Sequence, residues 1–298
     1  MLDLYQTTKM KNTLIALIAI VFCLSISACK KDGQDDGPKL IFKFKFDSTQ
    51  VRLNNIGQPA TLPAGHAAQS PVFRKMCAHY IELAPTAFTA LGSGKVLYRA
   101  DETTTGGSNA IDFAKAKVVA EGEDFFSIPL SSVTPGTYEW LRISLAYQNY
   151  DIKYRQSGYN GTGTVASFLG FNSYIGTYNI NTQPITVNAN RAQGYWAFET
   201  NVFGQYYTTS GQAPAGATTV VNPLASSSPI PAGSCVVTGL FGQALTITGN
   251  ETEDIVITVS LSTNNSFEWT DNGDGVYEPS AGDQVIDMGV RGLIPTVE

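Results

Sequence analysis

The stretch that decides the fold reads Leu40, Ile41, Phe42, Lys43, Phe44, Lys45, Phe46. Successive side chains of a β-strand point to opposite faces. Phe42, Phe44 and Phe46 are therefore predicted to lie on one face, and Ile41 and Lys43 on the other. A strand with one aromatic face and one partly charged face is typical of a sheet that covers a hydrophobic core with one side only.

The same alternation predicts further strands along the rest of the chain. They cover residues 95–99, 124–130, 138–147, 185–187, 195–200, 234–238, 244–248, 255–261 and 266–269. The single candidate helix, residues 73–90, is interrupted by Pro85, so we expect at most a short helix there. Many short strands separated by turn residues predict an all-β domain over residues 39–298, mainly an antiparallel β-sandwich with long surface loops.

Two segments of this domain are rich in Gly, Ser, Pro, Ala and Asn, and we expect loop insertions there. They lie near residues 155–164 and 210–233. Tyr159, Tyr206 and Tyr207 are candidate binding residues, because a tyrosine ring combines a flat apolar face with a polar hydroxyl group. Trp196 and Phe198 lie inside a predicted strand, and we expect them to pack in the core.

The N-terminal segment has the layout of a secretory signal. Lys9 and Lys11 precede an apolar run over residues 14–24, and small residues then lead to Cys29. A membrane-spanning helix needs about 20 apolar residues, and this run is shorter. A signal peptide over residues 1–28 is therefore predicted. The sequence around Cys29 resembles the lipobox of bacterial lipoproteins, which implies cleavage after Ala28 and lipid attachment to Cys29.

The segment that follows Cys29 is polar and contains Asp32, Asp35 and Asp36. Because it has almost no apolar surface to bury, residues 29–38 are predicted to be a flexible acidic tether. Acidic residues at this place resemble the export signal of Bacteroidota surface lipoproteins, which implies an outer-membrane location at the cell surface or at the periplasmic face. The alternative is an ordinary linker of a periplasmic protein.

The composition of the chain disfavours one class of partner, and it does not decide whether the two cysteines of the domain form a disulfide. The chain has 19 basic and 25 acidic side chains and a net charge of −6, which disfavours nucleic acid. Cys77 and Cys235 are the two cysteines of the predicted domain. In an oxidising compartment they are candidates for a disulfide, and the alternative is two separate buried thiols.

One segment is similar to a calcium-binding loop. In Thr270, Asp271, Asn272, Gly273, Asp274, Gly275, oxygen ligands alternate before a glycine at the bend. Asn272 and Asp274 are the candidate ligands, and Glu278 and Asp283 would complete the site in a loop of different shape. The alternative is a hairpin turn, for which Asn, Asp and Gly are the usual residues. A transition-metal site would need His66 and His79, the two histidines of the chain.

No catalytic motif follows Cys29. Ser93 lies between Gly92 and Gly94 but lacks the spacing of a hydrolase nucleophile elbow, and no pair of carboxylates stands out. The chain resembles the β-rich surface lipoproteins of Bacteroidota, and Pro135 to Tyr138 together with the opening Phe/Lys strand resemble MbnP-like lipoproteins.

We therefore expect a lipid-anchored, non-catalytic envelope module that binds a glycan or a protein. The alternatives are a structural component of the outer-membrane surface that assembles through an edge strand, and an envelope hydrolase.

Overall fold

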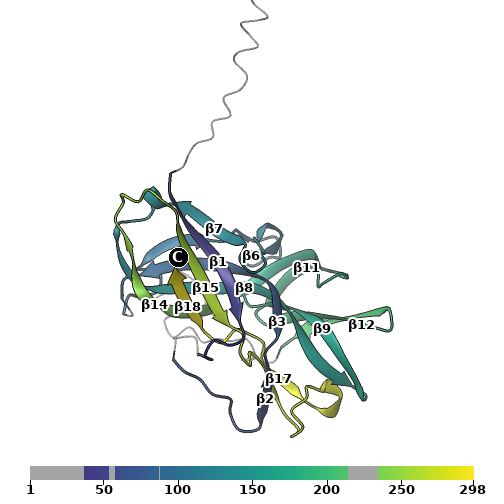
Figure 1. The fold of residues 1–298 in the computed structure, drawn as a ribbon. Helices are drawn as coiled ribbons and strands as arrows, with labels where there is room; N and C mark the ends of the chain where they lie inside the picture. Colours follow the sequence, from purple (N-terminus) through teal and green to yellow (C-terminus); the bar gives the residue numbers. More distant parts are fainter. Residues whose placement is uncertain (1–36, 54–57, 87, 214–233) are drawn as a thin grey trace, which may run out of the picture. The chain divides into compact units, whose positions relative to one another are not determined.

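The computed structural model describes residues 37–53, 58–86, 88–213 and 234–298. In this part of the chain, strands dominate and the helical segments are short 3-10 turns (Figure 1). The turns are η1 (Phe113–Lys115), η2 (Leu130–Ser132) and η4 (Pro279–Ala281). Within the described ranges, no helix is long and apolar enough to span a bilayer. The predicted all-β, mainly antiparallel fold is confirmed.

One layer of the fold is a four-stranded sheet. Its strands, in spatial order, are β18 (Leu293–Val297), β15 (Ile255–Ser262), β1 (Lys39–Asp47) and β7 (Asp124–Pro129). β1 pairs in parallel with β15 and antiparallel with β7. Leu40, Phe42 and Phe44 of β1 are buried, whereas Lys43 and Lys45 retain access to solvent, so the predicted alternation is confirmed.

The other layer is a seven-stranded sheet. It contains β13 (Gln205–Gln212), β12 (Tyr195–Val202), β9 (Tyr159–Phe168), β8 (Gly136–Gln156), β3 (Val72–Ala84) and β4 (Lys95–Arg99) in this order, and β14 (Cys235–Ile247), which pairs with β8. Phe42 and Phe44 belong to the same buried cluster as Ile81 of β3 and Ile143 of β8. Burial of each such side chain contributes roughly 1.5–3 kcal/mol, so the contact between the two layers is the main stabilising feature.

β8 has a different neighbour along each half of one edge. Its first half pairs with β14, from Gly136 to Leu145, and its second half pairs with β9, from Tyr147 to Gln156. The first half therefore belongs to the sandwich, whereas the second half continues into the sheet formed by β9, β12 and β13. In Figure 1 this extension lies away from the point where β1 begins.

Two smaller sheets complete the described structure. One has the order β11 (Pro184–Ala192), β10 (Asn172–Asn179), β6 (Ala110–Asp112) and β5 (Glu102–Thr103). The other has the order β17 (Gln284–Asp287), β16 (Phe267–Thr270) and β2 (His66–Gln69). The β16 sheet lies against the extension of the large sheet, because Phe267 and Trp269 share a buried cluster with Tyr150 and Ile152 of β8.

Three predictions about local structure need correction. The candidate helix at residues 73–90 is largely strand β3, which is paired on both edges and buried from Met76 to Ala84; such strands show no polar alternation. The predicted loop at 155–164 contains the end of β8, a tight turn and the start of β9. Ser157 and Gly158 have φ values of 50° and 79°, which suit a two-residue hairpin turn. Residues 210–212 belong to β13, and residues 214–233 lie outside the described part.

Candidate functional site

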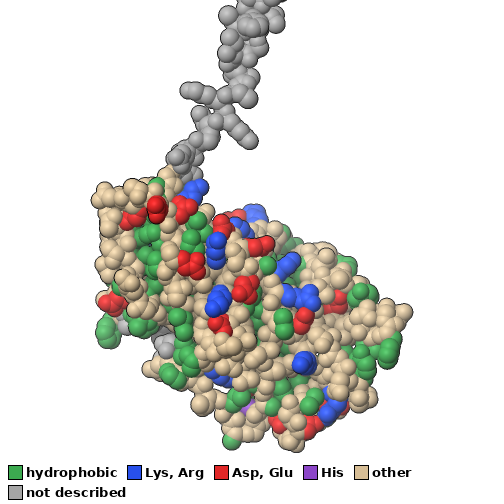
Figure 2. All heavy atoms as spheres, in the orientation of Figure 1, with side chains coloured by type: hydrophobic (Ala, Val, Ile, Leu, Met, Phe, Trp, Pro, Cys, Tyr) green, Lys and Arg blue, Asp and Glu red, His purple; other side chains and the backbone are tan. Residues whose placement is uncertain are grey.

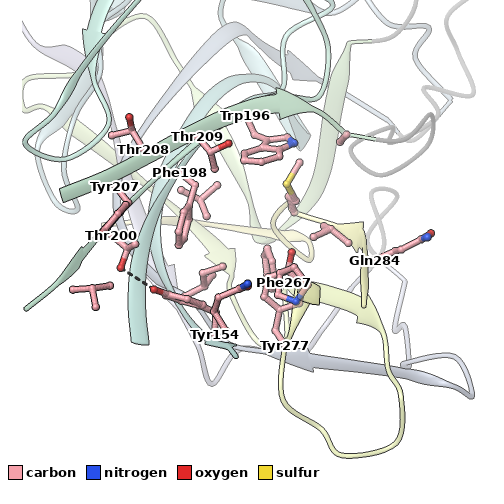
Figure 3. A pocket seen from close by; sticks show the side chains of 18 of the residues that line it. Tyr154, Trp196, Phe198, Thr200, Tyr207, Thr208, Thr209, Phe267, Tyr277 and Gln284 are labelled. Carbon is pink, nitrogen blue, oxygen red and sulfur yellow. Dashed lines mark hydrogen bonds between the residues drawn. The ribbon is translucent and has the colours of Figure 1, made fainter. Parts of the chain in front are cut away.

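A cavity of about 790 Å³ lies between the extension of the large sheet and the β16 sheet. Aromatic side chains line it from both sides, as Figure 3 shows. They include Tyr154 of β8, Trp196 and Phe198 of β12, Tyr207 of β13, Phe267 of β16, and Tyr277. Its size is that of a small-molecule site.

Strand register explains why one face of the sheet lines the cavity. Phe198 of β12 is paired with Val165 of β9 on one side and with Thr209 of β13 on the other. Paired residues project to the same face of a sheet, and residues two positions apart share that face. Trp196 and Thr200 therefore project to the same side as Phe198, and all of these side chains contribute to the cavity.

Glycines on this face allow the rings to lie close to the sheet. A Cβ atom on Gly163 would lie 2.1 Å from Cζ of Phe198, and one on Gly161 would lie 2.8 Å from the Tyr154 ring. At Gly211, a Cβ atom would lie 2.9 Å from Cζ2 of Trp196. Because no side chain stands on these three glycines, the rings cover the backbone and leave open space above them.

The opposite wall is a cluster of rings on β16 and on the connection from β16 to β17. The ring centroids of Phe267 and Tyr277 are 5.0 Å apart in an edge-to-face arrangement, and those of Trp269 and Tyr277 are 5.6 Å apart. Burial raises the pKa of Tyr277 to about 12, so its hydroxyl group is neutral at physiological pH. The backbone N–H of Arg155 donates to the carbonyl oxygen of Tyr277 at 2.8 Å, which joins this wall to β8.

The surface of the lining is mostly apolar. None of the described residues that line the cavity is Asp, Glu, Lys, Arg or His. The hydroxyl groups of Tyr154 and Thr200 are 3.1 Å apart, and Thr200 donates to the carbonyl oxygen of Thr162 at 3.1 Å. The described walls therefore offer apolar contact and stacking.

A second hollow of about 640 Å³ adjoins the first and is more polar. Tyr154, Tyr159 and Tyr277 line both spaces. Lys153, Asn160 and Thr162 are found only in the second one. Among the described residues that line it, Lys153 is the only charged side chain. The two spaces together therefore have an apolar part and a polar part.

Two of the three tyrosines predicted to bind line the cavity. Tyr159 and Tyr207 contribute to it, whereas Tyr206 does not. Tyr207 and Tyr206 are 57% and 51% exposed, and Phe203, at the turn between β12 and β13, is 90% exposed. Figure 2 shows hydrophobic side chains at the end of this hairpin, whereas charges of both signs are interspersed over the face with β1 and β7.

Trp196 and Phe198 are partly buried and pack against the cluster that contains Tyr150 and Phe267, as expected of core residues, and both also line the cavity. Alternation alone shows which side of a strand is apolar, and does not show whether that side meets a core or a cavity. Sequence reasoning missed Gly161, Gly163 and Gly211. Gly161 and Gly163 have a signal in the sequence, because they are glycines at alternate positions of a Thr-rich strand.

The residues of the candidate calcium loop form polar contacts with each other and with Arg155. Nε of Arg155 donates to Oε2 of Glu278 at 2.5 Å, and Nη2 of Arg155 pairs with Asp274. Asp283 accepts the backbone N–H of Glu278 at 2.8 Å, and Asn272 accepts that of Asp274 at 3.3 Å. The N–H of Val276 and the Arg155 guanidinium lower the pKa of Asp274. The guanidinium thus supplies the positive charge beside Asp274 and Glu278.

The two histidines belong to separate polar clusters. Nδ1 of His66 lies 2.5 Å from Glu268, which also pairs with Arg52 and Arg291. Nε2 of His79 lies 2.9 Å from Glu102, and burial lowers the pKa of His79. Across the described ranges, no three His, Cys, Asp or Glu side chains gather in a way that would hold a metal ion.

The two cysteines of the domain are free and buried. Cys77 is paired with Tyr147 on one edge of β8, and Cys235 is paired with Leu145 on the other edge. The two cysteines are therefore separated by two strand spacings, about 9.5 Å, which is more than the Cα–Cα distance that a disulfide can bridge. Cys77 and Cys235 are therefore two separate buried thiols, and the alternative, a disulfide between them, is not formed.

Comparisons with protein-family models, with curated proteins and with solved structures find no match to this chain. The cavity and the sequence features of the N-terminal segment are therefore the observations that bear on function.

Proposed function

We propose that this chain is a non-catalytic binding module of the cell envelope, anchored by lipid at Cys29, that holds its ligand in the aromatic cavity. The observation that carries the proposal is a cavity of about 790 Å³ whose described lining is rich in aromatic rings and has no charged side chain. Such a cavity can bury a ligand, and it lacks the acid and base groups of common hydrolases.

The N-terminal sequence supports the anchor. A basic start, a short apolar run and small residues before Cys29 are the features of a lipoprotein signal. One acyl chain binds a membrane only marginally, whereas two or more hold a protein there stably. A cell-surface or periplasmic face of an outer membrane is the location we propose.

The position of the cavity fits a module attached through its N-terminal end. In Figure 1, β1 begins at one end of the domain, and the hairpins of β9 and β12 lie at another. Tyr159 and Phe203, next to the turns of these hairpins, line the cavity. An N-terminal anchor would leave this part of the domain open to a ligand from the surroundings.

A structural role through an edge strand is the second candidate, and β13 is the observation that favours it. β13 ends the seven-stranded sheet, and nearly all of its residues are exposed. It has neither a charged residue nor a proline, which are the features that commonly protect an edge from pairing with another chain. By contrast, the edge strands β4 and β18 contain Lys95 and Pro295, respectively.

The anchor is tested by intact mass spectrometry of the protein purified from its native membrane. We expect a mass that corresponds to cleavage before Cys29 plus acyl chains, and its loss in Cys29→Ser. Cys23→Ser is the matched control, because Cys23 would leave with the signal peptide, and its mature mass should be unchanged. An unlipidated mature mass in the wild type would refute the anchor, and digestion of whole cells with protease would distinguish the cell surface from the periplasmic face.

A further inference from the structure

The two adjoining spaces suggest what kind of ligand the site takes. We propose that the ligand is an amphiphilic lipid, with its hydrocarbon chain in the aromatic cavity and its polar head in the adjoining hollow. This inference rests on the proposed binding function and adds the chemical class of the ligand.

The lining of the cavity is mostly apolar above the ring-covered sheet. A sugar or peptide carries many hydrogen-bonding groups, and each one buried without a partner costs about 1–3 kcal/mol. The hydroxyl groups of Tyr154 and Thr200, which lie on this wall, already have each other as partners. Gln, Thr and Tyr side chains also line the cavity, but most of the lining surface is apolar, so burial in it favours a hydrocarbon chain.

The glycines of the sheet give this wall a shape that suits a hydrocarbon chain. Phe198, Tyr154 and Trp196 cover Gly163, Gly161 and Gly211, which leaves ring surfaces and no protruding side chain. Phe267 and Tyr277 face them from the opposite wall (Figure 3). A space bounded on both sides by aromatic surfaces fits a chain of methylene groups, each of which gains about 0.8 kcal/mol on burial.

The polarity of the lining changes from the cavity to the adjoining hollow. Tyr154, Tyr159 and Tyr277 form the boundary, because they line both. The hollow beyond them is also lined by Lys153, Asn160 and Thr162, and the polar share of its surface is larger than that of the cavity. A ligand that fills both spaces must therefore be apolar at one end and polar at the other, and this is the definition of an amphiphile.

The test uses the full chain in nanodiscs of saturated phosphatidylcholine, so that no detergent competes for the cavity. The probe is cis-parinaric acid, a fluorescent fatty acid that accepts energy from tryptophan. Trp196 lines the cavity, so we expect energy transfer to the bound probe, displacement by oleic acid, and no displacement by maltohexaose. Trp196→Phe should lower the transfer while the probe still binds, and Trp269, which lines the adjoining hollow, should account for part of the transfer that remains.

A glycine pair provides the matched variants. Gly163→Ala would push the Phe198 ring into the cavity, since the new Cβ would lie 2.1 Å from it. We expect this variant to bind the probe at least about tenfold more weakly. Gly211→Ala makes a milder clash, at 2.9 Å, and should weaken binding less. Gly242→Ala is the control, because a Cβ there meets nothing within 4 Å, and it should bind like the wild type.

Two results would overturn the lipid proposal. Equal affinity of Gly163→Ala and Gly242→Ala would place the probe outside the cavity, provided that both variants unfold at the wild-type temperature. Displacement of the probe by maltohexaose but not by oleic acid would identify a glycan site instead, which would leave the binding module intact. Failure of the Cys29 mass experiment, in contrast, would refute the anchor and would not affect the ligand class.

Discussion

At the scale of single residues, Glu199 shows how a buried carboxylate organises a turn. Its side chain is 3% exposed and accepts the backbone N–H groups of Asn181, Thr182 and Gln183, and also the hydroxyl group of Thr182. Burial alone would raise the pKa of Glu199, but the hydrogen bonds from Thr182, Gln183 and Asn181 outweigh it and lower the pKa below its ordinary value. The charged form therefore stabilises the connection between β10 and β11.

We predict that Glu199→Gln lowers the free energy of unfolding by roughly 1.5–3 kcal/mol at neutral pH, because the hydrogen bonds to a charged acceptor are weakened. A group with a lowered folded-state pKa stabilises the protein above its unfolded-state pKa, and this contribution is lost as the pH falls through the folded-state value. Urea unfolding at neutral pH and near pH 3 should therefore show a difference between variant and wild type that shrinks in acid.

The control for this prediction is Glu121→Gln. Glu121 is exposed, and its replacement should change the free energy of unfolding by less than about 0.5 kcal/mol. If Glu199→Gln lowers the free energy of unfolding as much in acid as at neutral pH, the shape of the Glu199 side chain, and not its charge, stabilises the turn.

The sequence predicted a residue of the site only where the residue type by itself indicates a role in binding. Tyr159 and Tyr207 were identified because tyrosine is suited to binding, and both line the cavity. Gly161 and Gly163 looked like loop residues, since glycine is common in loops and its role beneath a ring depends on strand register. Likewise, the pairing of Arg155 with Glu278 joins positions 123 residues apart, and local sequence does not reveal such contacts.

At the scale of elements, alternation located the one-sided strands well. The predicted strand at 95–99 coincides with β4, and the one at 40–46 lies within β1. β3 was missed because it is buried on both faces, which removes the polar alternation that the prediction needs. β9 and β13 were missed because their Gly, Thr and Ser content resembles that of loops. In both cases, tertiary contacts outweigh local propensity.

The edge of β13 leads to a prediction at the same scale. If the chain assembles through this strand, Ser210→Lys should abolish chemical crosslinking to a partner in native membranes, because a lysine on an edge strand opposes pairing with another strand. Ser210 is exposed and does not line the cavity, so ligand binding should be unchanged. Thr296→Lys on the β18 edge is the control. If the crosslinks persist in Ser210→Lys, β13 is not the strand through which the chain assembles.

At the scale of the whole molecule, β8 connects the core with the candidate site. Leu141, Ile143 and Leu145 lie in the main cluster, whereas Tyr150 and Ile152 lie in the cluster next to the cavity. The strand passes from one cluster to the other without interruption. The sandwich therefore fixes the position of the cavity walls, and the ligand-binding end depends on the stability of the domain as a unit.

The buried thiols report on this stability. Burial raises the pKa of Cys77 and of Cys235 to about 12, so almost none of either thiol is ionised at neutral pH. Both lie on strands paired with β8, and a reagent can reach them only if those strands open. We predict that iodoacetamide modifies Cys77 and Cys235 at a common rate, equal to the rate of global unfolding, and that mild oxidants leave the unfolding temperature unchanged because no disulfide forms between them.

Peptide-level mass spectrometry would follow each thiol separately, with an exposed cysteine introduced as Ser131→Cys to show that the reagent is active. Rapid labelling of that site, with slow and equal labelling of the two buried thiols, is the expected result. Labelling of Cys77 much faster than Cys235 would show that β3 opens independently, and the domain would then not behave as one cooperative unit. The walls of the cavity would in that case move separately from the sandwich, and the affinity for a ligand would vary with the opening of β3.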